Sequence, residues 1–193
     1  MKRGGKPFRG MAPEPYRIRM MEPGEAMRLR EIDRRAGQLL VEAGHIADAE
    51  PLAPGRFVQF LLAHEVFVAE QDGEAVGFAA SVDLAEILAG EPEAAEGAGC
   101  TWLSALSVDP DHGRRGLGSA LLTAVVARAG WFFQRAVALS TARDLAFNEG
   151  FYARRGFLAV PPADRPPALR KRFDAELPPG VDPARRTVMV RWL

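Results

Sequence analysis

Residues 101–130 read TWLSALSVDPDHGRRGLGSALLTAVVARAG, and this stretch decides the fold expected for the rest of the chain. Thr101 to Val108 alternates and is rich in aromatic, hydroxyl and branched residues, which predicts a half-buried strand. Asp109-Pro110-Asp111 ends the strand, because proline offers no donor to the ladder. From Gly116 onward apolar residues recur at helical spacing, and Gly130 is expected to end that helix in a left-handed conformation. The unit is strand, basic glycine loop and helix.

The loop has the character of an anion-binding site. Its three glycines, Gly113, Gly116 and Gly118, allow a tight turn and a close approach of a ligand to the backbone. The first amides of the following helix lack intrahelical partners, and the helix start carries partial positive charge. Arg114 and Arg115 add two full charges, so the loop would accommodate a pyrophosphate.

Two well-known phosphate loops fit this sequence poorly. The P-loop of nucleotide hydrolases needs a lysine followed by Ser or Thr, whereas Gly118 is followed here by Ser119-Ala120. A dinucleotide-binding Rossmann loop follows its strand directly, but seven residues separate Val108 from Gly116. Leu121 also stands where the third glycine or alanine belongs. A dinucleotide-binding oxidoreductase is therefore disfavoured.

The window Gly113-Arg114-Arg115-Gly116-Leu117-Gly118 closely resembles the acyl-coenzyme A (CoA) loop of the GNAT superfamily of N-acyltransferases. That family's pattern is Gln or Arg, two free positions, Gly, one free position, then Gly or Ala. Gly113 departs from it, so a side-chain contact is missing there, although Arg114 offers a substitute charge. The backbone amides are unaffected by this change.

A second segment resembles the same family. A short apolar strand, Val137 to Ser140, is followed by Asn148, Tyr152 and Gly156-Phe157 at steps of four, which is the family's spacing. Steps of four place Asn148 and Tyr152 on one helix face, and Gly156 is a good helix terminator. On local sequence alone, Asn148 is equally suited to be a helix cap.

The resemblance implies a mixed α/β fold: a mostly antiparallel central sheet flanked by helices, with one splayed pair of parallel strands. The expected order is strand, two helices, three strands, helix, strand, helix, strand, short helix, strand. Residues 85–99 are expected to be an exposed acidic loop. Residues 1–15 are expected to be a flexible basic tail, and 16–193 a single N-acetyltransferase domain.

The resemblance also implies the roles of particular residues. Acyl-CoA would enter between the splayed strands, its pantetheine arm pairing with exposed backbone in the manner of an added strand. One backbone amide would face the thioester carbonyl and stabilise the oxyanion. The residues implied are Leu106, Ser107 and Val108 for pantetheine; Gly113, Arg114, Arg115, Gly116, Leu117, Gly118 and Ser119 for pyrophosphate; Asn148 for the CoA arm; and Tyr152 as the proton donor to the departing thiolate.

Tyr152 suits that role because a phenol with a pKa near ~10 stays protonated at neutral pH yet can protonate a thiolate. A general base is also expected, since an alkyl amine is almost wholly protonated at neutral pH and cannot attack. The sequence leaves this base open among Glu65, Glu70, Asp83, Asp144 and a water held by Ser104.

Composition narrows the alternatives. The chain has 193 residues, 48% of them hydrophobic, and a formal net charge of zero, so nothing global drives binding to nucleic acid or an anionic membrane. No apolar run approaches ~20 residues and no signal peptide is evident, so a cytoplasmic location is expected.

Cys100, the single cysteine, is either a small buried hydrophobe or a nucleophile. The three scattered histidines show no metal-ligand spacing, and no metal is expected.

The hypothesis from sequence is an N-acetyltransferase that uses acetyl-CoA as acyl-donor cosubstrate. It would move the acetyl group directly to a primary amine of a small molecule, peptide or protein. Neither nucleic acid nor membrane is an expected partner, and a homodimer is possible. The alternative kept open is a non-catalytic acyl-CoA-binding or regulatory module that uses the same cleft.

Overall fold

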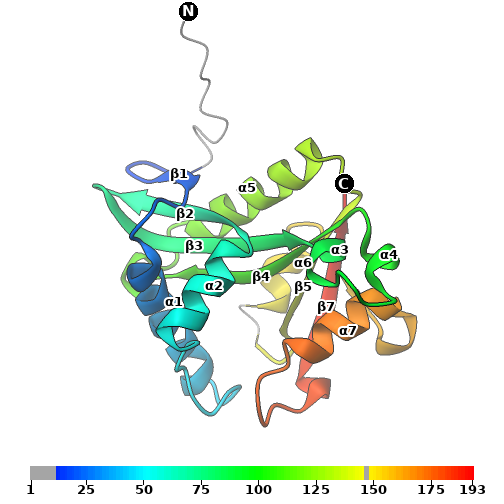
Figure 1. Ribbon diagram of the computed structural model, residues 1–193. Coiled ribbons are helices and arrows are strands. Elements are labelled where there is room, and N and C mark those ends of the chain that lie inside the picture. The colour runs from blue at the N-terminus through cyan, green and yellow to red at the C-terminus, as the bar shows by residue number, and fades with distance from the viewer. Residues whose placement is uncertain (1–11, 146–147) are drawn as a thin grey trace, which may run out of the picture.

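The computed structural model describes residues 12–145 and 148–193, and its elements surround one seven-stranded sheet (Figure 1). The strand order is β1-β2-β3-β4-β5-β7-β6; β4 and β5 are parallel, and all other neighbours are antiparallel. The mixed α/β fold is thus confirmed. The expected tail falls largely on residues 1–11, which lie outside the described residues. The strands are β1 Arg17–Met20, β2 Glu65–Gln71, β3 Glu74–Asp83, β4 Cys100–Val108, β5 Ala136–Ala142, β6 Leu158–Val160 and β7 Arg186–Trp192.

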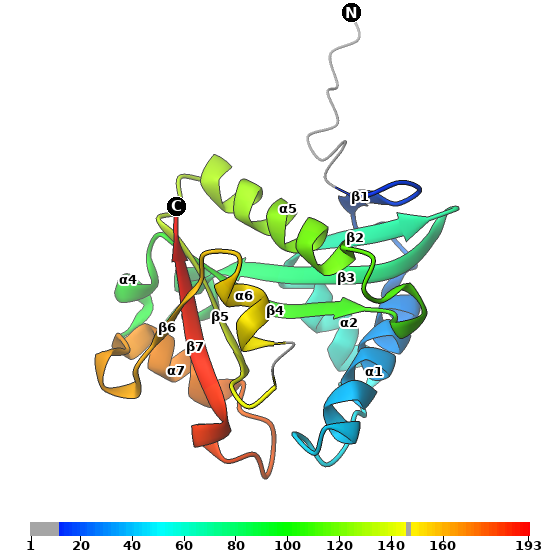
Figure 2. The same cartoon turned by 180° about the vertical axis from the view of Figure 1, so that it is seen from behind.

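Helices cover both faces of the sheet. On one face lie α1 (Ala26–Glu42), α2 (Pro54–Leu62) and α7 (Pro167–Ala175). On the other lie α5 (Leu117–Trp131) and α6 (Glu149–Ala153), which are in front in Figure 2. The amphipathic pattern explains the arrangement, because α1 and α5 each direct apolar residues at steps of three and four into the core. Buried examples are Leu29 and Ile32 in α1, and Leu117, Leu121 and Val125 in α5.

The segment 85–99 is not the open loop that its acidic, alanine-rich composition predicts. It contains two short helices, α3 (Leu84–Ile87) and α4 (Ala94–Gly97). Asp83 caps α3 by accepting a hydrogen bond from the Ala85 amide at 2.8 Å. Leu84 and Leu88 are buried in a cluster with Trp102, so apolar burial orders a segment whose average composition is polar.

The prediction that Gly130 ends helix α5 is wrong. The helix continues through Gly130 to Trp131, and Phe133 takes the left-handed conformation, with φ of 55°. The Gln134 amide donates to the Ala129 carbonyl at 3.0 Å, and the Phe133 amide donates to Gly130. This hydrogen-bonded closure requires a left-handed residue at Phe133, whatever its side chain.

A bulge in β4 and the short pairing of β4 with β5 shape the centre of the sheet. Ala80 pairs with Ala105 but Ser81 pairs with Leu103, which leaves Ser104 as the extra residue. The parallel pairing with β5 covers Cys100–Leu103 alone among the described residues, so the two strands separate beyond it. Within residues 12–145 and 148–193, no helix has both the length and the apolar character needed to span a bilayer.

Candidate active site

The second half of β4 presents free backbone groups to the space where β5 has diverged. The Asp109 amide donates to the Val76 carbonyl on β3 at 2.9 Å. Because hydrogen-bonding direction alternates along an antiparallel strand, Ser107 also faces β3, whereas Leu106 and Val108 direct their amides and carbonyls away from it. The strand therefore offers two residues, Leu106 and Val108, for pairing with an extended ligand.

The glycine loop after β4 adopts a conformation that aims amides outward. Arg114 and Gly116 have positive φ values of 59° and 82°, and α5 begins at Leu117. The first intrahelical bond runs from the Ala120 amide to Gly116, so the preceding amides have no partner in the helix. A Cβ at Gly113 would lie 3.0 Å from the Pro110 carbonyl oxygen, so the tight turn itself favours glycine at this position.

Two arginines of α1 hold the loop in place. Asp109, which is 1% exposed, accepts hydrogen bonds from Arg28 at 3.0 Å and from Arg35 at 2.8 Å. Arg35 also pairs with Asp111 at 2.9 Å, and this contact holds the pKa of the Asp111 carboxyl below its usual range. A buried carboxylate that is paired twice fixes the start of the loop against α1.

Helix α6 brings a further cation to the start of α5. Arg155 donates to the Ser119 hydroxyl and to the Phe151 carbonyl, and its guanidinium lies 3.8 Å from the Phe151 ring centre. Arg155 carries no functional signal of its own in the sequence, although it lies three residues after Tyr152 within the second motif. Its position beside the free amides of α5 makes it a candidate phosphate contact.

Tyr152 and Asn148 occupy the two ends of α6. Asn148 is at the N-cap position of α6, but its side chain makes no capping hydrogen bond. Capping therefore does not explain why asparagine stands at this position. The Tyr152 ring packs edge-on against Phe151 and Phe157, with ring centres 5.0 and 5.7 Å away. Burial raises the pKa of Tyr152 well above its usual range, opposed by the nearby guanidinium of Arg186, so the hydroxyl keeps its proton at neutral pH.

The bulge residue Ser104 belongs to a polar network on the α2 and α7 side of the sheet. Its hydroxyl contacts His64 Nε2 at 2.9 Å and Arg172 at 3.2 Å. Arg172 pairs with Glu176, which also accepts from Trp102 Nε1 at 2.9 Å. Burial raises the pKa of Glu176 and lowers that of His64. The network fixes the orientation of the bulge.

A cavity of about 310 Å³ lies on the same side, over the bulge and the free half of β4. Below, we refer to it as the bulge cavity. Asp33 of α1 projects into it, and its Oδ1 accepts a hydrogen bond from the Ser107 hydroxyl at 2.8 Å. Burial raises the pKa of Asp33. The residues lining the cavity are Asp33, Leu52, Phe57, Phe60, Ser104, Ala105 and Ser107.

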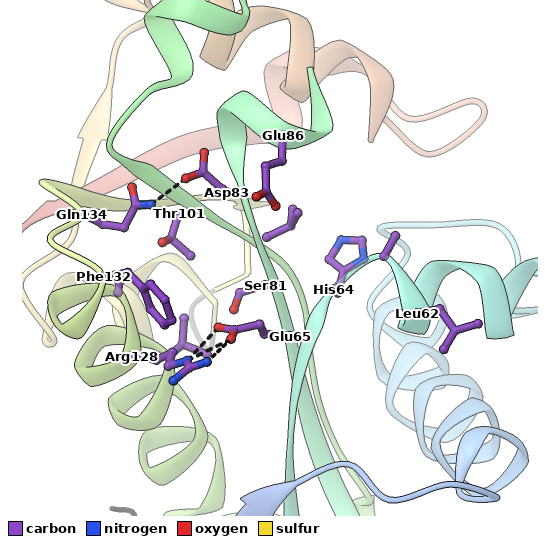
Figure 3. A pocket seen from close by; sticks show the side chains of 14 residues that line it. Leu62, His64, Glu65, Ser81, Asp83, Glu86, Thr101, Arg128, Phe132 and Gln134 are labelled. Atoms are coloured by element: carbon purple, nitrogen blue, oxygen red, sulfur yellow. Dashed lines mark hydrogen bonds and ion pairs between the residues drawn. The ribbon is translucent and has the colours of Figure 1, made fainter. Parts of the chain in front are cut away.

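A larger cavity of about 550 Å³ lies at the other end of the strands, beside the C-terminal turns of α5 (Figure 3). We refer to it as the strand-end cavity. Glu65 accepts from Arg128 Nε at 2.9 Å, and Asp83 accepts from Gln134 at 2.6 Å. Its acidic side chains are therefore mostly engaged with neighbours. Thr101, at the opposite end of β4 from Val108, also lines it.

The carboxylates proposed from sequence as the general base are engaged elsewhere. Glu65 and Asp83 belong to the strand-end cavity, and Glu70 pairs with Arg19 at 2.5 Å. Asp144 pairs with Arg185 at 2.6 Å and with His45 at 3.0 Å. None of these four lines the bulge cavity, whereas Ser104 does. Asp33 was missed, because nothing in the sequence relates α1 to β4.

Cys100 does not take part in this arrangement. It starts β4, six residues before Leu106, which is about 20 Å along an extended strand. Burial raises the pKa of its thiol to about 12, so it is not a thiolate at neutral pH. The structure supports the interpretation of Cys100 as a small hydrophobe.

The family model of the acetyltransferase (GNAT) family matches residues 29–157, which include both motifs and most of the sheet. The chain therefore belongs to the GNAT family. Its members are acyl-CoA-dependent acetyltransferases, and this protein is one of them.

Solved structures show the same fold at low sequence identity. N-acetylglutamate synthase from Neisseria gonorrhoeae, complexed with coenzyme A and N-acetyl-glutamate, is 20% identical with a TM-score of 0.65, covering 92% of this chain and 35% of that one. This chain thus spans about a third of that enzyme. PaiA N-acetyltransferase from Thermoplasma acidophilum, in complex with coenzyme A, is 14% identical (TM-score 0.63; 92% and 99% coverage). A GNAT acetyltransferase from Elizabethkingia anophelis with acetyl-CoA bound is also 14% identical (TM-score 0.58; 94% and 100%).

Proposed function

We propose that the protein transfers an acetyl group from acetyl-CoA directly to a primary amine of a small molecule or peptide. The observation that carries the proposal is the parting of β4 from β5 after Leu103, and three further features support it. These are the free backbone of Leu106 and Val108, the outward amides at the start of α5, and the protonated hydroxyl of Tyr152. Together they match an extended thioester with a pyrophosphate at one end.

Each part of the donor has a proposed contact. The pantetheine arm pairs with Leu106 and Val108, and the Leu106 amide donates to the thioester carbonyl as negative charge develops on its oxygen. Ser107 is not assigned a contact with the pantetheine arm, because its backbone faces β3 and its hydroxyl donates to Asp33. The amides from Arg114 to Ser119 hold the pyrophosphate with help from Arg155, and the side chain of Asn148, which does not cap α6, contacts the CoA arm.

Tyr152 is proposed as the general acid. When the amine attacks the thioester carbonyl, the new C–N bond forms and the C–S bond breaks, and the departing thiolate takes the Tyr152 proton. Arg186 supports this step, because its positive charge favours the phenolate that remains. This arrangement needs no covalent acyl-enzyme, in agreement with the high pKa and distant position of Cys100.

The first experiment is a calorimetric titration with acetyl-CoA, CoA and NAD, followed by thiol detection with a panel of primary amines. Micromolar binding of both CoA forms without NAD, together with thiol release that depends on an amine, supports the proposal. Binding without any transfer would establish the non-catalytic module instead. If neither CoA form binds, the proposal is wrong.

Tyr152→Phe tests the general acid. We expect kcat to fall about 100-fold or more at saturating substrates, with the acetyl-CoA Kd nearly unchanged. The matched control is Tyr16→Phe, the other tyrosine of the chain. Tyr16 contacts Arg115 at 2.7 Å and His112 at 3.2 Å, so its loss should weaken CoA binding a few-fold without lowering kcat. An unaltered kcat in Tyr152→Phe would remove its assigned role.

A further inference from the structure

We propose that the bulge cavity binds the acceptor as a compact primary amine with an apolar or aromatic skeleton and no neighbouring carboxylate, and that Asp33 accepts the amine's proton. This inference rests on the proposed function and specifies its acceptor. The position of the cavity, the chemistry of its walls and the single carboxylate among the described residues that line it support this assignment.

The position of the cavity suits an acceptor. Ala105 and Ser107 line it and flank Leu106, whose amide is assigned to the thioester carbonyl. Because of the bulge, the successive residues Ser104 and Ala105 both face the α1 and α2 side and line the cavity. An amine held there would approach the carbonyl carbon from the face of the sheet opposite α5. The donor's pyrophosphate is proposed to bind at the start of α5 itself.

The walls of the cavity indicate the class of amine. Leu52, Phe57 and Phe60 form an apolar side, and Asp33 is the one charged residue among the described residues that line it. An acceptor with a carboxylate next to its amine would meet Asp33 with no lining cation to compensate, which is electrostatically unfavourable. A volume of about 310 Å³ is at the small end for ligand pockets and fits a single ring on a short chain.

Asp33 is available for proton transfer. Its Oδ1 accepts from Ser107, and among the described residues its Oδ2 has no hydrogen bond or ion pair. The guanidinium of Arg30 lowers the pKa of Asp33 slightly, but it is engaged with Glu50 and with the Leu52 carbonyl at 2.8 Å. Burial raises the pKa of Asp33, which brings it closer to that of an ammonium group and makes the carboxylate a stronger base.

The acceptor nitrogen loses two protons in one turnover. The ammonium form gives one proton to the Asp33 carboxylate, and the free amine then attacks the thioester. The nitrogen loses its second proton as the amide forms, which offsets the proton that Tyr152 gives to the CoA thiolate. Asp33 returns its proton to solvent, so one acetylation releases one amide, one CoA thiol and one proton.

The acceptor class can be tested with the full-length wild-type protein, acetyl-CoA and four probes. The probes are 2-phenylethylamine, phenylalanine, spermidine and a short lysine peptide; the first two share a skeleton and differ by one carboxylate. We expect kcat/KM for 2-phenylethylamine to exceed that for phenylalanine by at least tenfold, and to exceed those for the other two. If phenylalanine, spermidine or the peptide is acetylated equally well, this inference is overturned while the proposed function stands. If no amine is acetylated, both fail.

Asp33→Asn tests the proton acceptor, because asparagine keeps the shape and the Ser107 contact but loses the charge. At pH 7.5 we expect kcat/KM for 2-phenylethylamine to fall about 100-fold with the acetyl-CoA Kd unchanged. The deficit should shrink markedly by pH 9.5, because the free-amine fraction rises about 100-fold over that interval. A purely structural role would leave the deficit independent of pH. The control is Glu42→Gln, an exposed carboxylate on the same helix, which should behave as wild type. A loss below threefold in Asp33→Asn would overturn Asp33 as the base.

Discussion

The two cavities beside the sheet differ in volume and in chemistry, and the smaller one is the better candidate for substrate binding. The strand-end cavity has about 550 Å³ and three acidic residues, but Glu65 and Asp83 are hydrogen bonded to neighbours and Glu86 is exposed at its rim. The bulge cavity has about 310 Å³ and one carboxylate, Asp33, with an oxygen left free among the described residues. Volume alone therefore does not mark the site; a partly buried carboxylate with one oxygen free of protein partners among the described residues, beside open backbone, does.

His64 connects the two regions. Its ring lines the strand-end cavity, while its Nε2 atom contacts Ser104 in the wall of the bulge cavity. Its Nδ1 lies 2.6 Å from the Phe60 carbonyl, which assigns the ring proton to Nδ1 and makes Nε2 the acceptor for the Ser104 hydroxyl. The two cavities thus share one wall, and variants on either side of it can separate their roles.

The largest difference is expected from filling each cavity. Ala105→Phe places a ring in the bulge cavity, and we expect kcat/KM for the amine to fall about 100-fold, because the acceptor loses its space beside β4. Glu86→Phe at the rim of the strand-end cavity should change kcat/KM for the amine less than twofold. Steady-state kinetics measure both, and an unchanged acetyl-CoA Kd in calorimetry shows that Ala105→Phe still folds. Equal losses in the two variants would contradict the comparison.

A smaller difference is expected from removing one aromatic ring on each side. Phe60→Ala should raise the KM for an aromatic amine about tenfold, which corresponds to about 1.4 kcal/mol of lost apolar contact. Phe132→Ala removes the ring that lies 4.3 Å from the Arg128 guanidinium in the strand-end cavity, and should leave the KM within twofold. A larger rise in KM for Phe132→Ala than for Phe60→Ala would show that the acceptor binds in the strand-end cavity and not in the bulge cavity.

The smallest effect is expected from the Glu65–Arg128 ion pair. Its side chains are 39% and 29% exposed, so we expect Glu65→Gln to cost about 1 kcal/mol of unfolding free energy or less, a shift of about 2–4 °C in Tm at most. Amine kinetics should stay within twofold of wild type. Thermal unfolding and thiol detection test these two expectations, and a tenfold loss of kcat would make Glu65 part of the catalytic site after all.

Most of the fold was predictable from local patterns, and the failures have physical reasons. The order of the elements was expected, as was a strand over Thr101 to Val108, which matches β4 within one residue, because this stretch has a clear period and ends at a turn signal. Helix α5 was expected to end at Gly130, but its closing hydrogen bonds place the left-handed residue at Phe133. The segment 85–99 was expected to be loop, because the buried leucines Leu84, just before it, and Leu88, within it, do not stand out beside an acidic sequence.

Less of the candidate site was predictable. The glycine loop, Asn148 and Tyr152 are local motifs, so their positions could be proposed from sequence, and their roles remain proposals. Asp33 and Arg155 lack such a signal, since each matters through contact with a distant element: Asp33 with Ser107, and Arg155 with Ser119. The pairing of the proposed bases Glu65, Glu70, Asp83 and Asp144 is likewise a property of the folded chain.

The sequence by itself determined the family, the order of the elements and the position of the loop suited to a pyrophosphate, because these depend on residue types at short, regular spacing. The tertiary structure alone decided which carboxylate is left unpaired, which face of β4 is open and where the acceptor can bind. Those properties come from the bulge at Ser104 and from the packing of α1 and α2 over β4, which brings together residues as far apart in the sequence as Asp33 and Ser107, 74 positions.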